Sequence, residues 1–492
     1  MTTGTGSGAL SPERRKLLDL MLKQKGVATR ADDRPRPLGP DEEKLLSFGQ
    51  QRLWFLDEMQ PHDSVYNVPG AIELLGPLDR DALQRAVDAI AERHEALRTT
   101  FRAEGSEPVQ VVSDDSHVDV PVIDVSDVPA DERYDRAIET AVEVSLRPFD
   151  LAAGPLWRTA LIRLERERHV FVTCMHHIVS DGWSLGILAT ELSDLYSAFV
   201  EGRPPELDPL EISYADFAVW QRRWFQADEL ERQLAYWKER LEGAPAVLEL
   251  PIDRPRPPIQ SFDGATVSFT FPTELSDAVA RLARAHEVTA FMVTLAAFKT
   301  LLHRYTGATD VVVGSPIAGR NRSEIEGLIG FFVNTLVLRT DLSGDPTFAE
   351  LLERTREVAL GAYAHQDLPF EKLVEELKPP RDLSISPVFQ VSFSMQDASV
   401  GDFHLSGLDV RFPDVKDNGA KFDLSLYLSE GDGEIGGELN YATVLFDRSS
   451  IETMIAHYLT LLGSLATAPD EPISRHRLIP PDEQRALVED LN

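Results

Sequence analysis

Residues 175–184 read Met-His-His-Ile-Val-Ser-Asp-Gly-Trp-Ser, and they form the most informative pattern in the chain. The β-branched and aromatic run at 170–173 precedes them and predicts a buried strand. Apolar residues then recur at steps of three and four from Leu185 to Phe199, which predicts an amphipathic helix with Ser184 as its N-cap. The pattern therefore predicts a strand–loop–helix junction that can hold a side chain rigidly at the edge of a cleft.

The two adjacent histidines are not expected to serve one centre together. Successive residues on a strand point to opposite faces, so one of His176 and His177 should face the reacting groups and the other the packed interior. Cys174 shares the parity of His176, so a Cys174–His177 nucleophile pair is not expected if the strand continues to His177. Gly182 can adopt a positive φ, and the resulting turn would bring Asp181 beneath the histidine or toward a buried arginine.

A histidine in this setting is typical of proton transfer, because neutral imidazole exchanges protons near pH 7. No Gly-x-Ser-x-Gly nucleophile elbow occurs in the chain, which suggests that the nucleophile belongs to a bound substrate. The alternatives are a core histidine satisfied by hydrogen bonds, and a metal ligand. His177 and Asp181 supply only two ligands, whereas a catalytic zinc usually takes three from the protein, so no metal is expected.

Seven segments, in order along the chain, resemble the motifs of one family. Residues 175–184 resemble the His-His-x-x-x-Asp-Gly signature of condensation domains from nonribosomal peptide synthetases. The six others are Ser-Phe-Gly-Gln-Gln-Arg-Leu-Trp at 47–54, Arg-His-Glu-Ala-Leu-Arg-Thr-Thr-Phe at 93–101, Tyr-Ala-Asp-Phe-Ala-Val-Trp at 214–220, Ile-Gly-Phe-Phe-Val-Asn-Thr at 329–335, His-Gln-Asp-Leu-Pro-Phe-Glu at 365–371 and Arg-Asp-Leu-Ser at 381–384. The first departs from the family pattern at Gly49, where alanine is more usual.

Pattern and resemblance together predict the fold. Alternation at 266–271 and the apolar run at 310–313 predict strands, and helical periodicity spans 273–287 and 290–305. Mixed strands and helices in this order predict the α/β class, as an α+β sandwich. The resemblance implies two chloramphenicol acetyltransferase-like lobes in a V-shaped pseudo-dimer, with the signature at their junction and a tunnel through it.

The resemblance also implies a reaction. The amine of an acceptor aminoacyl thioester attacks a donor acyl or peptidyl thioester to form an amide, and His177 is the catalytic residue. Both substrates hang on phosphopantetheine arms of partner carrier proteins, so the domain itself is expected to bind no cofactor. Whether His177 removes a proton or only positions the amine stays open at this point. Which groups are joined, and the stereochemistry of the donor, are not readable from the chain.

Several other residues are expected to support His177. They are His176, Asp181, Gly182, Trp183, Ser184 and Asn334. A carboxylate in a buried junction needs a positive partner, so Arg98 and Arg339, both near motif segments, are candidates for a structural salt bridge to Asp181. The backbone amide of Gly182 is a candidate donor to the oxyanion that forms at the attacked carbonyl.

The chain is expected to divide into four parts. Residues 1–40 form a linker or docking segment with a short helix after Ser11, and 41–220 form an N-terminal lobe that carries the signature. Residues 221–478 form a C-terminal lobe, and 479–492 resemble the linker that leads to an adenylation domain. The chain would then be a piece of a larger synthetase. The short N-terminal helix would either dock on an upstream synthase subunit or serve only as a linker.

Composition agrees with these expectations. A chain of 492 residues is too long for one ordinary core, and 43% hydrophobic residues suffice for two lobes. No apolar run reaches the roughly 18–20 residues that span a bilayer, and the N-terminus lacks a signal-peptide core. The single cysteine fits a reducing cytoplasm. A net charge of −32 argues against a nucleic-acid partner. Because carrier proteins are commonly acidic too, upstream donor and downstream acceptor carriers should dock through apolar contacts and local basic patches.

Other members of the superfamily provide the alternatives. Epimerization domains share the signature, but the Asp-Gly-Trp-Ser sequence and the motif at 365–371 look like condensation. Cyclisation domains replace the histidines with aspartates, which this chain does not. Ester-forming and starter-acyl condensation enzymes use the same residues and remain open. From a different class, an inactive relative could serve only as a carrier-binding recruitment platform.

Overall fold

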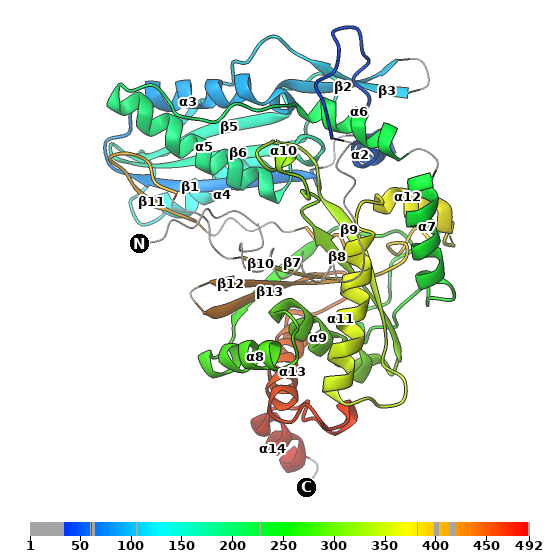
Figure 1. Cartoon of the computed structure of the whole chain (residues 1–492). Coiled ribbons are helices and arrows are strands. Elements are labelled where there is room, and N and C mark those ends of the chain that lie inside the picture. The colour runs from blue at the N-terminus through cyan, green and yellow to red at the C-terminus, as the bar shows by residue number, and fades with distance from the viewer. Residues whose placement is uncertain are drawn as a thin grey trace.

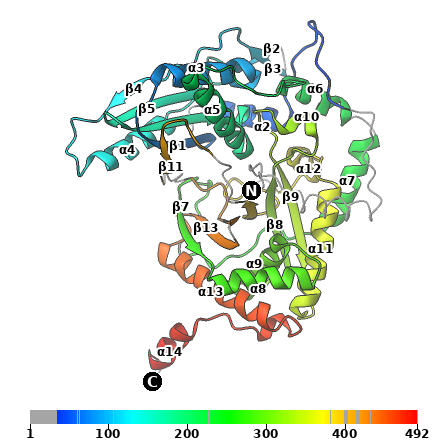
Figure 2. The ribbon, with the colours of Figure 1, turned by 60° about the vertical axis from the view of Figure 1, so that its left-hand side comes forward.

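Two β-sheets, each covered by helices, divide the molecule into two lobes (Figure 1). In the turned view the lobes meet on the side of α2, α10 and α12 and diverge on the opposite side, which produces a V (Figure 2). The computed structural model describes residues 34–59, 61, 64–104, 107–225, 228–380, 382–397, 403–413, 419–431 and 433–490. The helix expected after Ser11 lies outside the described residues.

The first lobe is built on a five-stranded sheet with helices on both faces. Its strand order is β11 (Asp409–Arg411), β1 (Asn67–Leu75), β6 (Arg168–His176), β5 (Trp157–Glu165) and β4 (Val122–Asp124). Phe171 and Met175 of β6 pack with α3 (Arg80–Arg93) and α5 (Gly182–Glu201), whereas Val170 and Val172 pack with α4 (Arg133–Ser145) on the other face. The buried strand predicted at 170–173 is therefore confirmed, and its side chains alternate between two covered faces.

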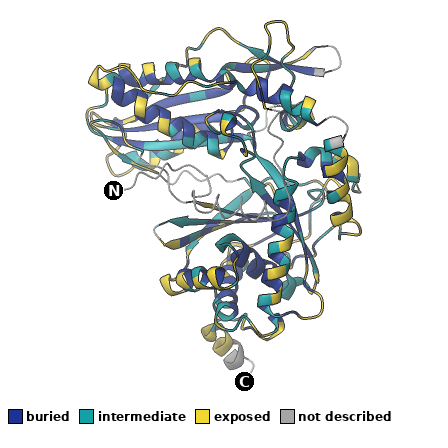
Figure 3. Ribbon diagram, viewed as in Figure 1, coloured by how far each residue is buried: buried dark blue, intermediate teal, exposed yellow. Residues whose placement is uncertain are grey.

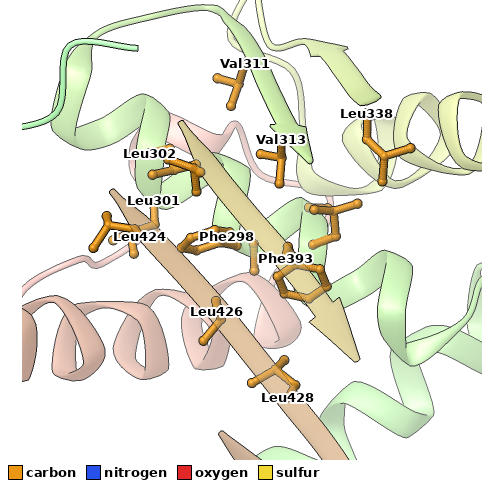
Figure 4. Close-up of a cluster of buried hydrophobic side chains, with 14 of the residues drawn as sticks. Phe298, Leu301, Leu302, Val311, Val313, Leu338, Phe393, Leu424, Leu426 and Leu428 are labelled. Atoms are coloured by element: carbon orange, nitrogen blue, oxygen red, sulfur yellow. The ribbon is translucent and has the colours of Figure 1, made fainter. Parts of the chain in front are cut away.

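The second lobe is built on a six-stranded mixed sheet. Its order is β7 (Gly264–Thr270), β13 (Glu434–Ala442), β12 (Leu424–Gly431), β10 (Val391–Asp397), β8 (Asp310–Ile317) and β9 (Asn334–Asp341). Helices α8 (Thr273–Ala285), α9 (Ala290–Thr306), α11 (Phe348–Ala364) and α13 (Arg448–Thr467) contribute to its core. Figure 4 shows the centre of this core, where α9 side chains meet β8, β10 and β12. The strands and helices predicted between 266 and 313 are confirmed within a few residues.

Several elements lie outside the two large sheets and the helices that cover them. They are α2 (Phe48–Met59), α6 (Tyr214–Trp224), α7 (Asp228–Leu241), α10 (Ser323–Glu326) and α12 (Phe370–Leu377), with a separate hairpin of β2 (Thr99–Glu104) and β3 (Glu107–Val112) preceded by the turn η1 (Glu95–Arg98). The predicted boundary at residue 220 falls inside α6. In addition, β11 pairs with β1, so chain that follows most of the second lobe completes the first sheet. The turn η3 (Ile473–Arg475) precedes α14 (Pro481–Asp490), which lies at the far end of the second lobe (Figure 1).

The sheets and the helix surfaces packed against them form the cores, and exposed residues gather on the outer surfaces of the helices (Figure 3). Within the described part of the chain, no single helix is long and apolar enough to cross a membrane. The bent pair α8–α9 meets that test only by combined length and composition.

Candidate active site

The strand β6 ends at His176, and the chain then makes one 3-10 turn, η2 (His177–Val179), before α5 begins. Three contacts fix this turn. His177 N–H donates to the Tyr66 carbonyl at 2.7 Å, and His176 N–H donates to the Leu156 carbonyl at 2.9 Å. The Gln50 side chain of α2 donates to the Ile178 carbonyl at 3.1 Å. The position of His177 is therefore set by the segments just before β1 and β5 and by α2.

The two histidines have different surroundings. His176 is buried, and its Nδ1 accepts the Ile178 N–H at 3.1 Å, so its ring caps the turn. His177 is partly exposed, and its Nδ1 lies 2.7 Å from the Ser180 carbonyl. Because a carbonyl can only accept, Nδ1 of His177 carries the proton and Nε2 carries the free lone pair. Only His177 combines access with an available acceptor.

Protein packed around the His177 ring keeps it uncharged. Burial lowers the pKa of His177 to about 4, with a further decrease from the positive charge of Lys421, although Asp181 and the bond to Ser180 favour the protonated form. Burial likewise lowers the pKa of His176 to about 3. Phe331 contributes to this packing, since its ring lies edge to face with the His177 ring at a centroid distance of 4.9 Å. At neutral pH, His177 is a hydrogen-bond acceptor.

The lone cysteine is not a nucleophile for this histidine. Cys174 is buried, its Sγ lies 3.5 Å from the Ser145 carbonyl, and burial raises the pKa of its thiol to about 12. This prediction assumed a strand that continues to His177, whereas β6 ends at His176. The Cys174 thiol nevertheless points toward α4. Among the described residues, no group of three or more His, Cys, Asp or Glu side chains is placed to hold a metal ion.

Asp181 is paired with a buried arginine of the second lobe. Arg320 Nη2 lies 3.1 Å from Asp181 Oδ1, and the two side chains are 0% and 2% exposed. Arg320 also donates to the carbonyls of Ile325 at 2.7 Å and Leu328 at 2.6 Å, and its guanidinium lies 4.0 Å from the Phe332 ring centroid. The two charges are therefore paired inside the junction, and most N–H groups of Arg320 donate hydrogen bonds there.

The prediction that Arg98 or Arg339 would pair with Asp181 is wrong. Arg98 donates to the Ser113 carbonyl, beside the β2–β3 hairpin. Arg339 lies on β9 and pairs with Asp310 of β8, with Nη2 2.7 Å from Oδ2. Both side chains are held in their own lobes, so neither reaches the junction where Asp181 is buried.

Asp181, not Ser184, is the N-cap of α5. Its Oδ1 accepts the Ser184 N–H at 2.9 Å and the Ser184 hydroxyl at 2.7 Å, and its Oδ2 accepts the Phe332 N–H at 3.0 Å. Ser184 is therefore the third residue of the helix, in its first turn, where its Oγ also accepts the Gly330 N–H at 3.1 Å. Because Asp181 provides the turn, Gly182 is the first helical residue and is not among the positive-φ residues, contrary to expectation.

Trp183 binds across the junction, whereas Asn334 binds within the second lobe. Trp183 Nε1 donates to the Glu326 carbonyl of α10 at 3.0 Å. The Asn334 side chain binds the 365–371 motif: its amide donates to the carbonyls of Gln366 and Leu368, both at 2.8 Å, and accepts the Phe370 N–H at 3.0 Å. Asn334 thus orders this motif at the start of α12.

The departure at Gly49 has a steric reason. A Cβ at Gly49 would lie 2.6 Å from the Phe331 ring. The same Phe331 ring contacts His177. Gly49 and Phe331 also line a cavity, together with Trp220, Asn321 and Asp367 among others. The missing methyl group therefore makes room for Phe331 beside His177.

Pattern reasoning missed four contributors to the site. They are Arg320, Tyr66, Gln50 and Lys421. Arg320 lies in Gly319-Arg320-Asn321, shortly after the predicted strand at 310–313. A positive residue soon after a buried strand could have indicated a partner for Asp181. Tyr66 acts through its backbone carbonyl, which no side-chain pattern reveals. Lys421 lies far from the motifs in sequence, and only folding brings it near the histidines.

Comparison with known proteins gives consistent results. The family model described as Condensation domain matches residues 41–488. One of the proteins that make up the linear gramicidin synthase of Brevibacillus parabrevis is 46% identical over 458 residues, which cover 93% of this chain and 9% of that protein. The chain therefore spans about a tenth of the length of that relative.

Solved structures share the architecture. The X-domain from teicoplanin biosynthesis has a TM-score of 0.81 and 29% identity, covering 91% of this chain and 100% of that one. The first condensation domain of the calcium-dependent antibiotic synthetase, in complex with a substrate analogue, has a TM-score of 0.74 at 22% identity, covering 89% and 100%. The second likeness concerns the fold alone. The chain belongs to the condensation domain family of nonribosomal peptide synthetases, and its two lobes have the chloramphenicol acetyltransferase-like fold.

Proposed function

We propose that this domain forms an amide between a donor acyl or peptidyl thioester and an acceptor aminoacyl thioester. The observation that carries the proposal is the state of His177, which presents an unprotonated Nε2 at the lobe junction with no serine or cysteine nucleophile of its own among the described residues. A site that offers an acceptor but no nucleophile suits a substrate that brings its own amine. The family of the chain supports the same reaction.

The reaction balances without a cofactor on the domain. The acceptor nitrogen attacks the thioester carbonyl, a C–N bond forms, the C–S bond breaks, and one proton moves from nitrogen to the departing sulfur. His177 Nε2 accepts a hydrogen bond from the amine and so aims its lone pair at the carbonyl. Positioning of this kind lowers the barrier by several kcal/mol.

The pKa of His177 limits when it takes the proton. An α-ammonium has a pKa near 8, so direct transfer to a group with a pKa of about 4 would be uphill by roughly 5 kcal/mol. The amine must therefore enter uncharged. Once the C–N bond has formed, the nitrogen becomes far more acidic, and His177 can then accept its proton and pass it to the sulfur. Positioning comes first and proton transfer second.

We further propose that both substrates arrive on phosphopantetheine arms of upstream donor and downstream acceptor carrier proteins, and that an adenylation domain follows the C-terminal helix. His176, Asp181, Gly182, Trp183 and Ser184 would hold the position of His177, and Asn334 would order the loop beside α12. The parts 1–40, 41–220, 221–478 and 479–492 are proposed as linker, two lobes and linker. These assignments rest on the family and on the contacts at the junction.

The test compares His177→Ala with the parent, using one donor and one acceptor carrier, each loaded with a defined group. Peptide on the acceptor is measured by mass spectrometry over time. His117→Ala is the matched control, because that histidine is exposed and paired with Asp88 and Asp119 far from η2. Peptide formation should fall by about 10²-fold or more in His177→Ala alone. An unchanged rate would reject the catalytic role of His177.

The same assay separates the alternative functions. A hydroxyacyl acceptor that reacts faster than its amino counterpart would indicate an ester-forming enzyme. A donor requirement for a simple acyl group would indicate a starter domain. A parent protein that binds both carriers but forms no product with any pair would indicate a recruitment platform.

A further inference from the structure

One positive side chain of the second lobe reaches the histidines of the first. Lys421 lies just before β12, and its Nζ is 5.4 Å from the ring centroid of Tyr66 in the first lobe. Tyr66 precedes β1, and its carbonyl accepts the His177 N–H at 2.7 Å. The Tyr66 ring also lies 6.4 Å from the His176 ring. The ammonium therefore contacts the residue that holds the backbone of His177.

The chain around Lys421 is fixed to its own lobe. Ala420 N–H donates to the Phe262 carbonyl at 2.8 Å, and the Gln260 side chain donates to the Lys421 carbonyl at 3.0 Å. Two residues later, the buried Asp423 pairs with Arg256, with Nη1 2.8 Å from Oδ1. The reach of Lys421 across the junction is therefore supported from both sides of the residue.

We propose that Lys421 is a positioning residue of the active site, which acts through His177. The second lobe holds its ammonium beside the Tyr66 ring, and Tyr66 in turn fixes the backbone of His177 and lies beside the His176 ring. This inference rests on the proposed function, because it assigns a role within the same reaction. It also couples the chemistry to the relative placement of the lobes, since Lys421 and His177 lie on different ones.

Burial is the largest cause of the low His177 pKa, and Lys421 is the charge that lowers it further. Asp181 would favour the protonated form, but its carboxylate bonds to Arg320, Ser184 and the Phe332 N–H. Arg52 of α2, which also acts on Tyr66, is paired with Glu371 of α12 at 3.1 Å. His176, whose pKa burial lowers to about 3, carries no charge near neutral pH. Lys421 is the charge with the largest effect on the His177 ring, and it lowers the pKa of both histidines.

The same charge suits the substrates of the proposed reaction. A nearby cation disfavours an ammonium, so an acceptor amine that enters beside Lys421 would lose its proton more readily. It also favours the negative oxygen that forms when the amine attacks the thioester.

The experiment measures the pKa of His177 directly. The protein is labelled at the histidine ring carbons, and NMR spectra are recorded from pH 3 to 8. The His177 signal is assigned by its loss in His177→Gln. Lys421→Met should raise the His177 pKa by about one unit, whereas Lys421→Arg, which keeps the charge, should leave it low. The rate of peptide formation from loaded carriers should fall in Lys421→Met at neutral pH, because the positive charge that favours the forming oxyanion is lost. His177 itself stays unprotonated at that pH in both proteins.

A matched control is present in the same lobe. Lys372 of α12 also crosses the junction, with Nζ 5.3 Å from the ring centroid of Phe48, but it lies beside Glu375 and is not among the charges that act on His177. Lys372→Met removes an equal charge and a similar ring contact, and should leave the His177 pKa unchanged. Thermal unfolding confirms that each variant is folded.

Two results would overturn the inference: a His177 pKa in Lys421→Met that equals the parent value, or an equal rise in Lys372→Met. Because Lys421 is exposed, Lys421→Gln replaces Lys421→Met if the latter does not fold. Failure of the role of Lys421 and failure of the proposed function give different results. Peptide formation by His177→Ala at the parental rate would reject the function, and an unmoved pKa together with an inactive His177→Ala would reject only the role of Lys421.

Discussion

Removal of Arg320 should destabilise the protein strongly, because its guanidinium and the Asp181 carboxylate lie together in the junction without access to water. The side chains are 0% and 2% exposed. In Arg320→Met, Asp181 keeps its bonds to Ser184 and Phe332 but loses its counter-charge, and the carbonyls of Ile325 and Leu328 lose their donor. The chain offers no second cation at this position in the described residues that could take over.

The expected magnitude follows from burial. Breaking a fully buried pair by removing one partner costs roughly 3–5 kcal/mol, because the remaining charge is left uncompensated. Asp181→Asn should cost a similar amount, since it leaves Arg320 without an anion. The double variant Asp181→Asn/Arg320→Met leaves no charge behind, so it should lose little more than either single variant. The coupling energy is then about 3 kcal/mol.

The assay is a double-mutant cycle measured by urea unfolding and tryptophan fluorescence. Arg339–Asp310 serves as the control pair, because its side chains are 24% and 35% exposed and water screens them. Its coupling should be about 1 kcal/mol or less. Midpoints and slopes are compared transition by transition, since two lobes need not unfold together. Additive losses at Asp181 and Arg320, within about 0.5 kcal/mol, would refute the reasoning, as would equal coupling in the control pair.

Three further outcomes can be measured. Burial lowers the pKa of Lys299 to about 7. Above that pH the unfolded state binds more protons than the folded state, so the free energy of unfolding rises with pH. Relative to Lys299→Met, the parent should gain up to about 2.7 kcal/mol between pH 7.5 and 9.5, as measured by urea unfolding at both pH values. Gly49→Ala places a methyl group against Phe331, so it should change the rate of peptide formation while Tm falls by only a few degrees; an unchanged rate would show that Phe331 yields freely. Gly182→Ala meets no atom within 4 Å and occupies a helical position, so it should leave stability unchanged or raise it by about 0.5–1 kcal/mol; a marked loss would show that this backbone needs glycine.

Local patterns predicted the elements that carry the site. The β-branched and aromatic run at 170–173 was sufficient for β6, and the apolar steps from Leu185 onward were sufficient for α5. A run of this kind favours a buried strand, and steps of three and four match the turn of a helix. The error at Ser184 was of the ordinary size for an element boundary. Both Asp181 and Ser184 are residue types that cap helices, and only the bond from Ser184 N–H to Asp181 Oδ1 distinguishes them.

The sequence by itself determined the class of fold and the family, since each depends on residues close together along the chain or on motifs in a fixed order. It offered two adjacent histidines, and only the resemblance singled out His177, whose catalytic role stays a prediction. Tertiary structure alone decided what surrounds that histidine. Arg320 lies 139 residues from Asp181 along the chain, and Lys421 reaches the first lobe from a segment before β12. Such pairs depend on how two lobes pack, and packing of distant surfaces leaves no periodic trace in the sequence.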